Sequence, residues 1–427
     1  MSQSNTRNRF RLASLCLLIA FVPLQWGRIS FPGGSINIRD AGSILYILLA
    51  FAIFFTDRRS LDRRFKTILI AYLLVAVTSA VAFLSHATFN GFDLIQQCML
   101  YSAVIYLVVV NGVKSTDLVV LGRIGALSTA VFLVLSANSM GMNFISEFVA
   151  WLTHYEYRTM LSSFYRPIFN AFSPESDDLL ISGSKRNAFS MSLLLIMYLL
   201  AFGFFQLNQK KYAVLDFMLF LFLLLLVMTM FARSAILIMF LSVVIYILVR
   251  RDVTRGAIIR LVIYGSLGAG LLLLLMTNTD FGEIIYERIF LDSYSYEYRL
   301  GQIDEFFDAI SGNYLTGVGF YISYSGNTLH NFFLGNWAHA GILGLLAVCL
   351  MYWFVFLQFL SVITAPRLKI LAMLFLPFFI KSLVGGNAGF PELSVLLAMA
   401  IALAVQSNTL RAEGLVSRSR TIKRRSL

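Results

Sequence analysis

Three residues carry the side chains best suited to chemistry. Arg233 lies in a turn of a few residues between two long apolar runs, and Arg299 opens an amphipathic stretch. His330, followed by Asn331, lies where the next apolar run begins. A guanidinium offers a bidentate fork to a phosphate, and an imidazole can accept a proton from a sugar hydroxyl near neutral pH. These residue types predict a site that holds an anion and deprotonates a hydroxyl.

Each of the three residues also has a structural interpretation, which the sequence leaves open. Arg233 is also suited to anchoring a helix at a membrane surface, with its charged head in water, although the positive-inside rule disfavours an arginine on the external side. Arg299 has Glu297 and Asp304 nearby, so a local ion pair is an alternative. A lone histidine such as His330 is more often a hydrogen-bonded structural residue than a catalytic base.

The elements that position these residues are predicted to be membrane helices. Of the 427 residues 59% are hydrophobic and 13% charged, and the mean hydropathy is +0.78. This composition excludes a secreted disulfide scaffold, a cytosolic enzyme and a β-barrel. We expect an all-α fold, a polytopic bundle of about twelve spans of roughly 20 residues each. The expected spans are 8–26, 41–56, 67–86, 94–110, 123–139, 188–206, 212–230, 235–250, 257–276, 337–362, 368–384 and 392–409.

The basic residues predict the orientation of the chain. The net charge is +12, but most Lys and Arg residues fall in alternate connections that also include both termini. The positive-inside rule then places both termini in the cytoplasm of a bacterial inner-membrane protein. The basic tail 411–427 is interpreted as an anchor to membrane lipids, and nucleic-acid binding is not expected.

Within a single membrane domain, 1–427, two external connections are unusually long. They span 141–186 and 277–336, and both are predicted to contain amphipathic helices at the membrane surface. In the second loop the apolar face is expected at Leu300, Ile303, Phe307 and Ile310. The alternative is a small external cap that only packs on the bundle. Because the cytoplasmic connections are short, we expect the active site on the periplasmic side.

These motifs resemble a known family. The chain looks like the bacterial O-antigen ligase and polysaccharide polymerase superfamily, most recognisably over 187–345. The similarity rests on Ala232-Arg233-Ser234-Ala235, Arg299, Gly317-Val318-Gly319, His330-Asn331 and Gly341-Ile342-Leu343-Gly344, and more loosely on Gly183–Ala188. Family members usually carry Ser-Arg where this chain has Ala232-Arg233, so the match there depends on the arginine and its position.

The resemblance implies a GT-C-like membrane glycosyltransferase that takes a glycan from an undecaprenyl-diphosphate donor at the periplasmic face. The reaction would invert the anomeric configuration and would need neither a metal nor a cofactor. His330 would be the general base, and Arg233 and Arg299 would neutralise the diphosphate. The expected substrate-binding residues are Arg166, Lys185, Arg186, Arg288, Asn331, Gly317 and Gly319. In the sequence, no cluster of His, Cys, Asp or Glu has the spacing of a metal site.

Several functions remain open at this level. We favour polymerisation of O-antigen or exopolysaccharide repeat units, with a glycan acceptor, over ligation to lipid A core. A protein O-glycosyltransferase is a smaller third option. A flippase for lipid-linked oligosaccharide is the alternative from another class, and it predicts a charged central cavity that the nearly charge-free spans disfavour. Other polysaccharide-assembly proteins are possible partners.

Overall fold

The computed structural model describes part of the chain. The described residues are 28–31, 34–37, 63–86, 114–139, 143–146, 179–207, 212–229, 233–249, 294–319, 331–365, 368–384 and 399–400, with isolated positions between these ranges. The predicted spans 8–26 and 257–276 lie outside them, and only isolated residues of 41–56, 94–110 and 392–409 are described.

The described chain is almost wholly helical, which confirms the helical part of the prediction. The helices are α3 (Arg63–His86), α5 (Ser115–Ser139), α9 (Leu179–Ala201), α10 (Ala213–Thr229), α11 (Arg233–Val249), α14 (Tyr294–Ile310), α15 (Phe332–Ile363), α16 (Lys369–Ala372) and α17 (Phe375–Val384). A π-helical turn, η4 (Phe202–Gln206), extends α9. The exception is an antiparallel hairpin of β1 (Arg28–Phe31) and β2 (Gly34–Asn37), which the sequence analysis did not predict. Pro32-Gly33, a strong turn signal, joins its strands.

Three helices in the described ranges are long and apolar enough to cross a membrane. They cover Lys66–Ser85, Ser115–Leu135 and Phe332–Ile363. Shorter apolar helices cover Phe189–Phe204, Ala213–Val227 and Ser234–Tyr246. Many of their large apolar side chains are exposed, for example Leu84 at 78% and Val214 at 76%. Exposed apolar surface on long apolar helices is typical of a protein that faces lipid.

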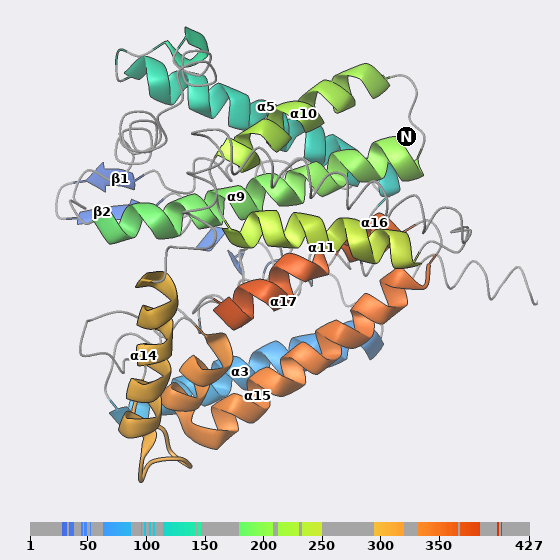
Figure 1. Ribbon diagram of the computed structural model, residues 1–427. Helices are drawn as coiled ribbons and strands as arrows, with labels where there is room; N and C mark the ends of the chain where they lie inside the picture. The colour runs from blue at the N-terminus through green and yellow to red at the C-terminus, as the bar shows by residue number, and fades with distance from the viewer. Residues whose placement is uncertain are drawn as a thin grey trace, which may run out of the picture.

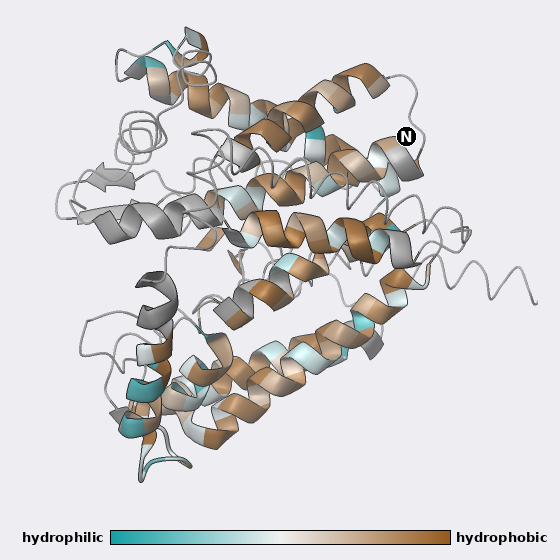
Figure 2. Cartoon of the chain, in the orientation of Figure 1, coloured by the Kyte–Doolittle hydropathy of each residue, from teal (hydrophilic) through white to brown (hydrophobic). Residues whose placement is uncertain are grey.

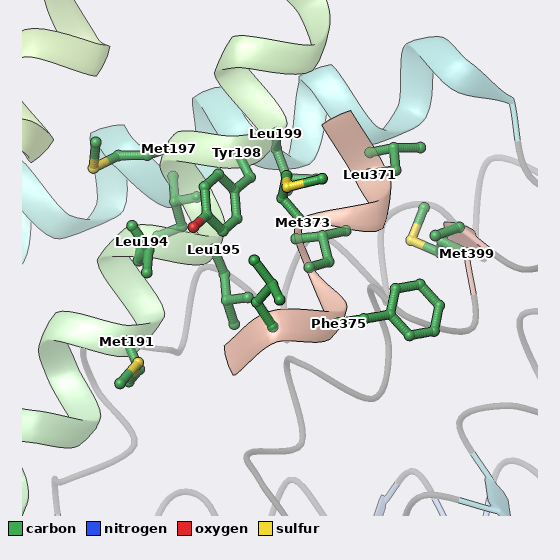
Figure 3. Packing of buried hydrophobic residues seen from close by; sticks show 14 of the residues in the cluster. Met191, Leu194, Leu195, Met197, Tyr198, Leu199, Leu371, Met373, Phe375 and Met399 are labelled. Atoms are coloured by element: carbon green, nitrogen blue, oxygen red, sulfur yellow. The ribbon is translucent and has the colours of Figure 1, made fainter. Parts of the chain in front are cut away.

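Helix α9 forms the centre of the core. Every residue from 189 to 200 is buried, so this helix is covered on all sides. Figure 3 shows its side chains Leu195, Tyr198 and Leu199 facing Met373 and Phe375 from the α16–α17 segment. In Figure 1, α5 and α10 lie on one side of α9, and α11, α17, α15 and α3 follow on the other. The brown ribbons of Figure 2 show how apolar these helices are.

Contacts between helices fix their directions. Gly122 of α5 lies against Leu199, and Val119 lies against Gly203, so α5 runs antiparallel to α9. Short connections make α10 antiparallel to α9 and α11 parallel to it. A hydrogen bond between the hydroxyls of Tyr198 and Ser242 ties α9 to α11. Figure 1 shows α9, α11 and α15 beginning at the same end of the bundle, which we call the Arg233 end.

Several predicted span boundaries differ from the structure, most of all for α9, which begins at Leu179, nine positions before the predicted start at residue 188. The predicted span 368–384 is interrupted, since α16 ends at Ala372 and α17 begins at Phe375. Pro377 provides the reason, because its ring clashes with the carbonyl four residues earlier and removes a helical hydrogen bond. Helix α5 begins at Ser115, eight positions before the predicted start at residue 123, and the carboxylate of Asp117 accepts the backbone N–H of Lys114 at 2.9 Å.

Candidate functional site

The starts of α9 and α11 bring three predicted basic positions to similar levels of the bundle. Arg233 is the first residue of α11. The Tyr198–Ser242 hydrogen bond sets these two residues at one level of the parallel helices α9 and α11. The same number of residues toward the start of each helix leads to Arg233 in α11 and to residue 189 in α9, so these two positions are level. Lys185 and Arg186 therefore lie about one helical turn, roughly 5 Å, beyond Arg233. The side chains of these three residues are not described; their backbone positions lie at the Arg233 end, within about one helical turn of one another along the bundle.

Asn331 has a clear structural role at the start of α15. Its side-chain oxygen accepts the backbone N–H groups of Phe333 at 3.0 Å and Leu334 at 3.1 Å, so it is the N-cap of the helix. Its side-chain nitrogen donates to the carbonyl of Leu383 at 3.3 Å, near the end of α17. Asn331, predicted to bind substrate, thus joins the start of α15 to the end of α17 at the Arg233 end.

Helix α14 packs on the first part of α15, but not through the predicted face. The buried side chains are Gln302, Phe306 and Ile310, and the Phe306 ring lies 5.6 Å from the Trp337 ring. Of the predicted face only Ile310 is buried; Leu300, Ile303 and Phe307 are exposed, as Phe307 shows at 50%. The helix has two adjacent apolar stripes, and α15 covers the one centred on Phe306.

Arg299 lies on α14 at about the level of Asn331. In Figure 1 the starts of α14 and of α15 lie toward the same side, so the two contacting segments run in the same direction. Arg299 precedes Phe306 by two helical turns, and Asn331 precedes Trp337 by nearly as much, about 9–11 Å along each axis. The helical register also places position 299 on the α14 face that carries Gln302 and Phe306.

The glycine turn 311–319 joins α14 to the region around α15. Gly317 and Gly319 have positive φ values, 74° and 91°, so the chain turns sharply there. A Cβ on Gly317 would come within 2.6 Å of the backbone nitrogen of Gly341. Gly317, predicted to bind substrate, is thus enclosed by backbone of α15, which gives it a packing role.

The remaining predicted site residues lie beyond what is described. His330, Arg166 and Arg288 are outside the described residues, and so is the side chain of Arg299. For the predicted site residues that lie in described helices, the structure gives the backbone positions. Arg233, Lys185 and Arg186 lie at one end of the bundle, and Arg299 is level with Asn331. In the described ranges, no group of three His, Cys, Asp or Glu residues could hold a metal ion.

The sequence analysis missed a buried ion pair between two helices. Arg123 of α5 donates to both carboxylate oxygens of Asp216 of α10, at 2.6 and 2.8 Å. Asp216 is 1% exposed, and the Arg123 guanidinium carbon lies 4.6 Å from the centre of the Tyr212 ring. Both residues had been assigned to the ends of spans, so the spans are less free of charge than expected. Because each charge has its partner, the pair ties helices together and leaves no open charged site there.

Comparison with known proteins adds no identification, since no protein family and no curated protein matches the chain.

Proposed function

We propose that the protein transfers a glycan from a polyprenyl-diphosphate donor to a hydroxyl acceptor at the Arg233 end, on the periplasmic side of a bacterial inner membrane. The observation that carries the proposal is that Lys185, Arg186 and Arg233 lie at similar levels at this end of two neighbouring parallel helices. Polymerisation of repeat units is the preferred form of the reaction, with ligation to lipid A core as the alternative. The described helices then belong to a GT-C-like bundle of about twelve spans with cytoplasmic termini.

The position of the basic residues suits a lipid-borne diphosphate. Such a donor keeps its diphosphate at the level of the lipid headgroups, where membrane helices end. The backbone N–H groups at the start of α11 add a partial positive charge beside Arg233. Cations fixed in advance stabilise the charge that develops as the diphosphate leaves, without reorganisation during the reaction.

The remaining step requires a base for the acceptor. In the proposed reaction His330 takes the proton of the acceptor hydroxyl, whose oxygen attacks the anomeric carbon as the bond to the diphosphate breaks. Attack in one step inverts the configuration at that carbon. His330 directly precedes the capped start of α15, and Arg299 is level with that start, so base and cation would meet at one site.

Reconstitution tests the proposal directly. Purified protein in liposomes, supplied with lipid-diphosphate repeat units alone, should produce longer chains. A requirement for lipid A core would identify a ligase. Movement of substrate across the bilayer without a new glycosidic bond would refute glycan transfer and identify a carrier.

Arg233 offers the sharpest variant. Arg233→Ala should abolish transfer in a protein that remains folded and inserted, and Arg233→Lys should restore only part of it because lysine lacks the bidentate fork. The matched control is Lys114→Ala, which removes an exposed cation at the opposite end, just before α5. Full activity of Arg233→Ala would remove this residue from the site.

A further inference from the structure

Helix α15 is bent at a defined place. Ala340 (φ −119°, ψ 16°) and Gly341 (φ 66°, ψ −160°) leave the helical conformation, so residues 332–339 form a short segment before the long apolar one. A bend of this kind interrupts the hydrogen bonds between successive turns. It frees backbone groups on both sides, which need other partners when they are buried.

The turn that follows α14 supplies those partners. The carbonyl of Ala338 accepts the backbone N–H of Val318 at 2.7 Å, and the backbone N–H of Ile342 donates to the carbonyl of Tyr314 at 3.1 Å. The same Tyr314 carbonyl accepts the indole N–H of Trp337 at 3.1 Å. We call these contacts, between residues 314–318 and 337–342, the clasp. It holds α15 on both sides of the bend.

Two glycines allow the clasp to close. Gly317 and Gly341 both have positive φ, at 74° and 66°, so a side chain at either position is strained. A Cβ on Gly317 would also lie 2.7 Å from the carbonyl oxygen of Ala338, and a Cβ on Gly341 would overlap the carbonyl of Leu315. The two backbones therefore touch directly, and no other residue fits without moving one of them.

We propose that the clasp is a positioning device that holds the start of α15 level with Arg299. The clasp residues follow α14 without a break, and the Phe306–Trp337 contact joins α14 to the same short segment of α15. Helix α14, the turn and the short segment thus form one unit that carries position 299 at one point and Asn331, the residue after His330 in the sequence, at another. This role rests on the proposed glycan transfer, in which Arg299 and His330 act together.

Glycine substitutions test the clasp by activity. Gly341→Ala and Gly317→Ala should lower the turnover of repeat units, by roughly 100-fold if the base moves by about an ångström. The KM for the donor should change much less, because the clasp residues 314–318 and 337–342 belong to neither α9 nor α11. The matched control is Gly335→Ala, which adds the same methyl group to the short segment where nothing lies within 4 Å. Unchanged turnover in a folded Gly341→Ala protein overturns the positioning role.

A milder variant covers the case in which the alanine variants fail to fold. Trp337→Phe removes the indole hydrogen bond to Tyr314 and keeps an aromatic ring beside Phe306. Since the Tyr314 carbonyl retains its bond to Ile342, we expect a fall in turnover of a few-fold, again with little change in donor KM. A rise in donor KM without a fall in turnover contradicts the proposal.

A distance measurement tests the clasp without any activity. Spin labels at Gly335 and Leu346, on either side of the bend in a chain with its cysteines replaced by alanine, should give a narrow distance distribution. Gly341→Ala should shift or broaden it, whereas Gly301→Ala, in open space on α14, should not. An unchanged distribution overturns the clasp. If wild-type protein forms no glycosidic bond, the proposed function fails, and the distance result still decides whether the clasp exists.

Discussion

Removing the carboxylate of Asp216 is the most direct test of how the helices are held together. Asp216 is 1% exposed and receives two hydrogen bonds from Arg123, at 2.6 and 2.8 Å. Removing one partner of a buried ion pair leaves an uncompensated charge, which typically costs about 3–5 kcal/mol. Because the Arg123 side chain is 16% exposed, water relieves part of this cost. For Asp216→Ala we therefore expect the free energy of unfolding to fall by about 3 kcal/mol, near the lower end of that range.

Two further variants refine this expectation. Asp216→Asn keeps a hydrogen-bond acceptor but loses the charge. Since charge-assisted hydrogen bonds are roughly twice as strong as neutral ones, Asp216→Asn should lose about half as much stability as Asp216→Ala. In the double variant Arg123→Ala with Asp216→Ala, no charge is left unpaired. It should be less destabilised than the sum of the two single variants by about 2 kcal/mol, within the range of coupled pairs.

The assay is reversible unfolding in mixed micelles, followed by far-ultraviolet circular dichroism. Asp304→Ala is the control, because Asp304 is exposed on α14 and its removal should change the stability by no more than about 0.5 kcal/mol. If Asp216→Ala costs no more than this control, or if the two single effects simply add, the inference that the pair holds α5 to α10 is refuted.

Two more predictions use the same assay. Tyr198→Phe removes the hydroxyl that bonds to Ser242 and should destabilise the α9–α11 contact by about 1 kcal/mol, with a smaller loss meaning that the bond contributes little. Gly122→Leu adds a side chain where a Cβ alone would lie 2.9 Å from the Leu199 Cβ, so overpacking should cost about 1–3 kcal/mol. Gly301→Leu, in open space, should not show this loss.

The apolar helices were largely predictable. The expected spans 67–86, 212–230 and 235–250 agree within a few residues with α3, α10 and α11. A long apolar run satisfies its own backbone hydrogen bonds as a helix, whatever its neighbours are, so composition and length are sufficient to find it. The ends were less certain, and the break at Pro377 needed attention to one residue that hydropathy averages out.

Helix α14 shows where periodicity stops being informative. The stripe of Leu300, Ile303 and Phe307 is as apolar as the neighbouring stripe of Phe306 and Ile310, and both repeat with helical spacing. Periodicity identifies an apolar face but not the partner that covers it. The position of α15 decided which stripe is buried, and therefore that the face shared by position 299, Gln302 and Phe306 is the one that α15 covers.

The sequence alone determined that the chain is built from apolar helices and that several basic residues fall at their starts, because both follow from local composition. The tertiary structure decided which of these starts meet. The Arg123–Asp216 pair joins residues 93 positions apart. The clasp brings Gly317 against Gly341 at a bend in α15 that the apolar run of this helix does not predict. Such contacts depend on the closeness of two backbones and on satisfying freed hydrogen-bonding groups, which become defined only when the helices have packed.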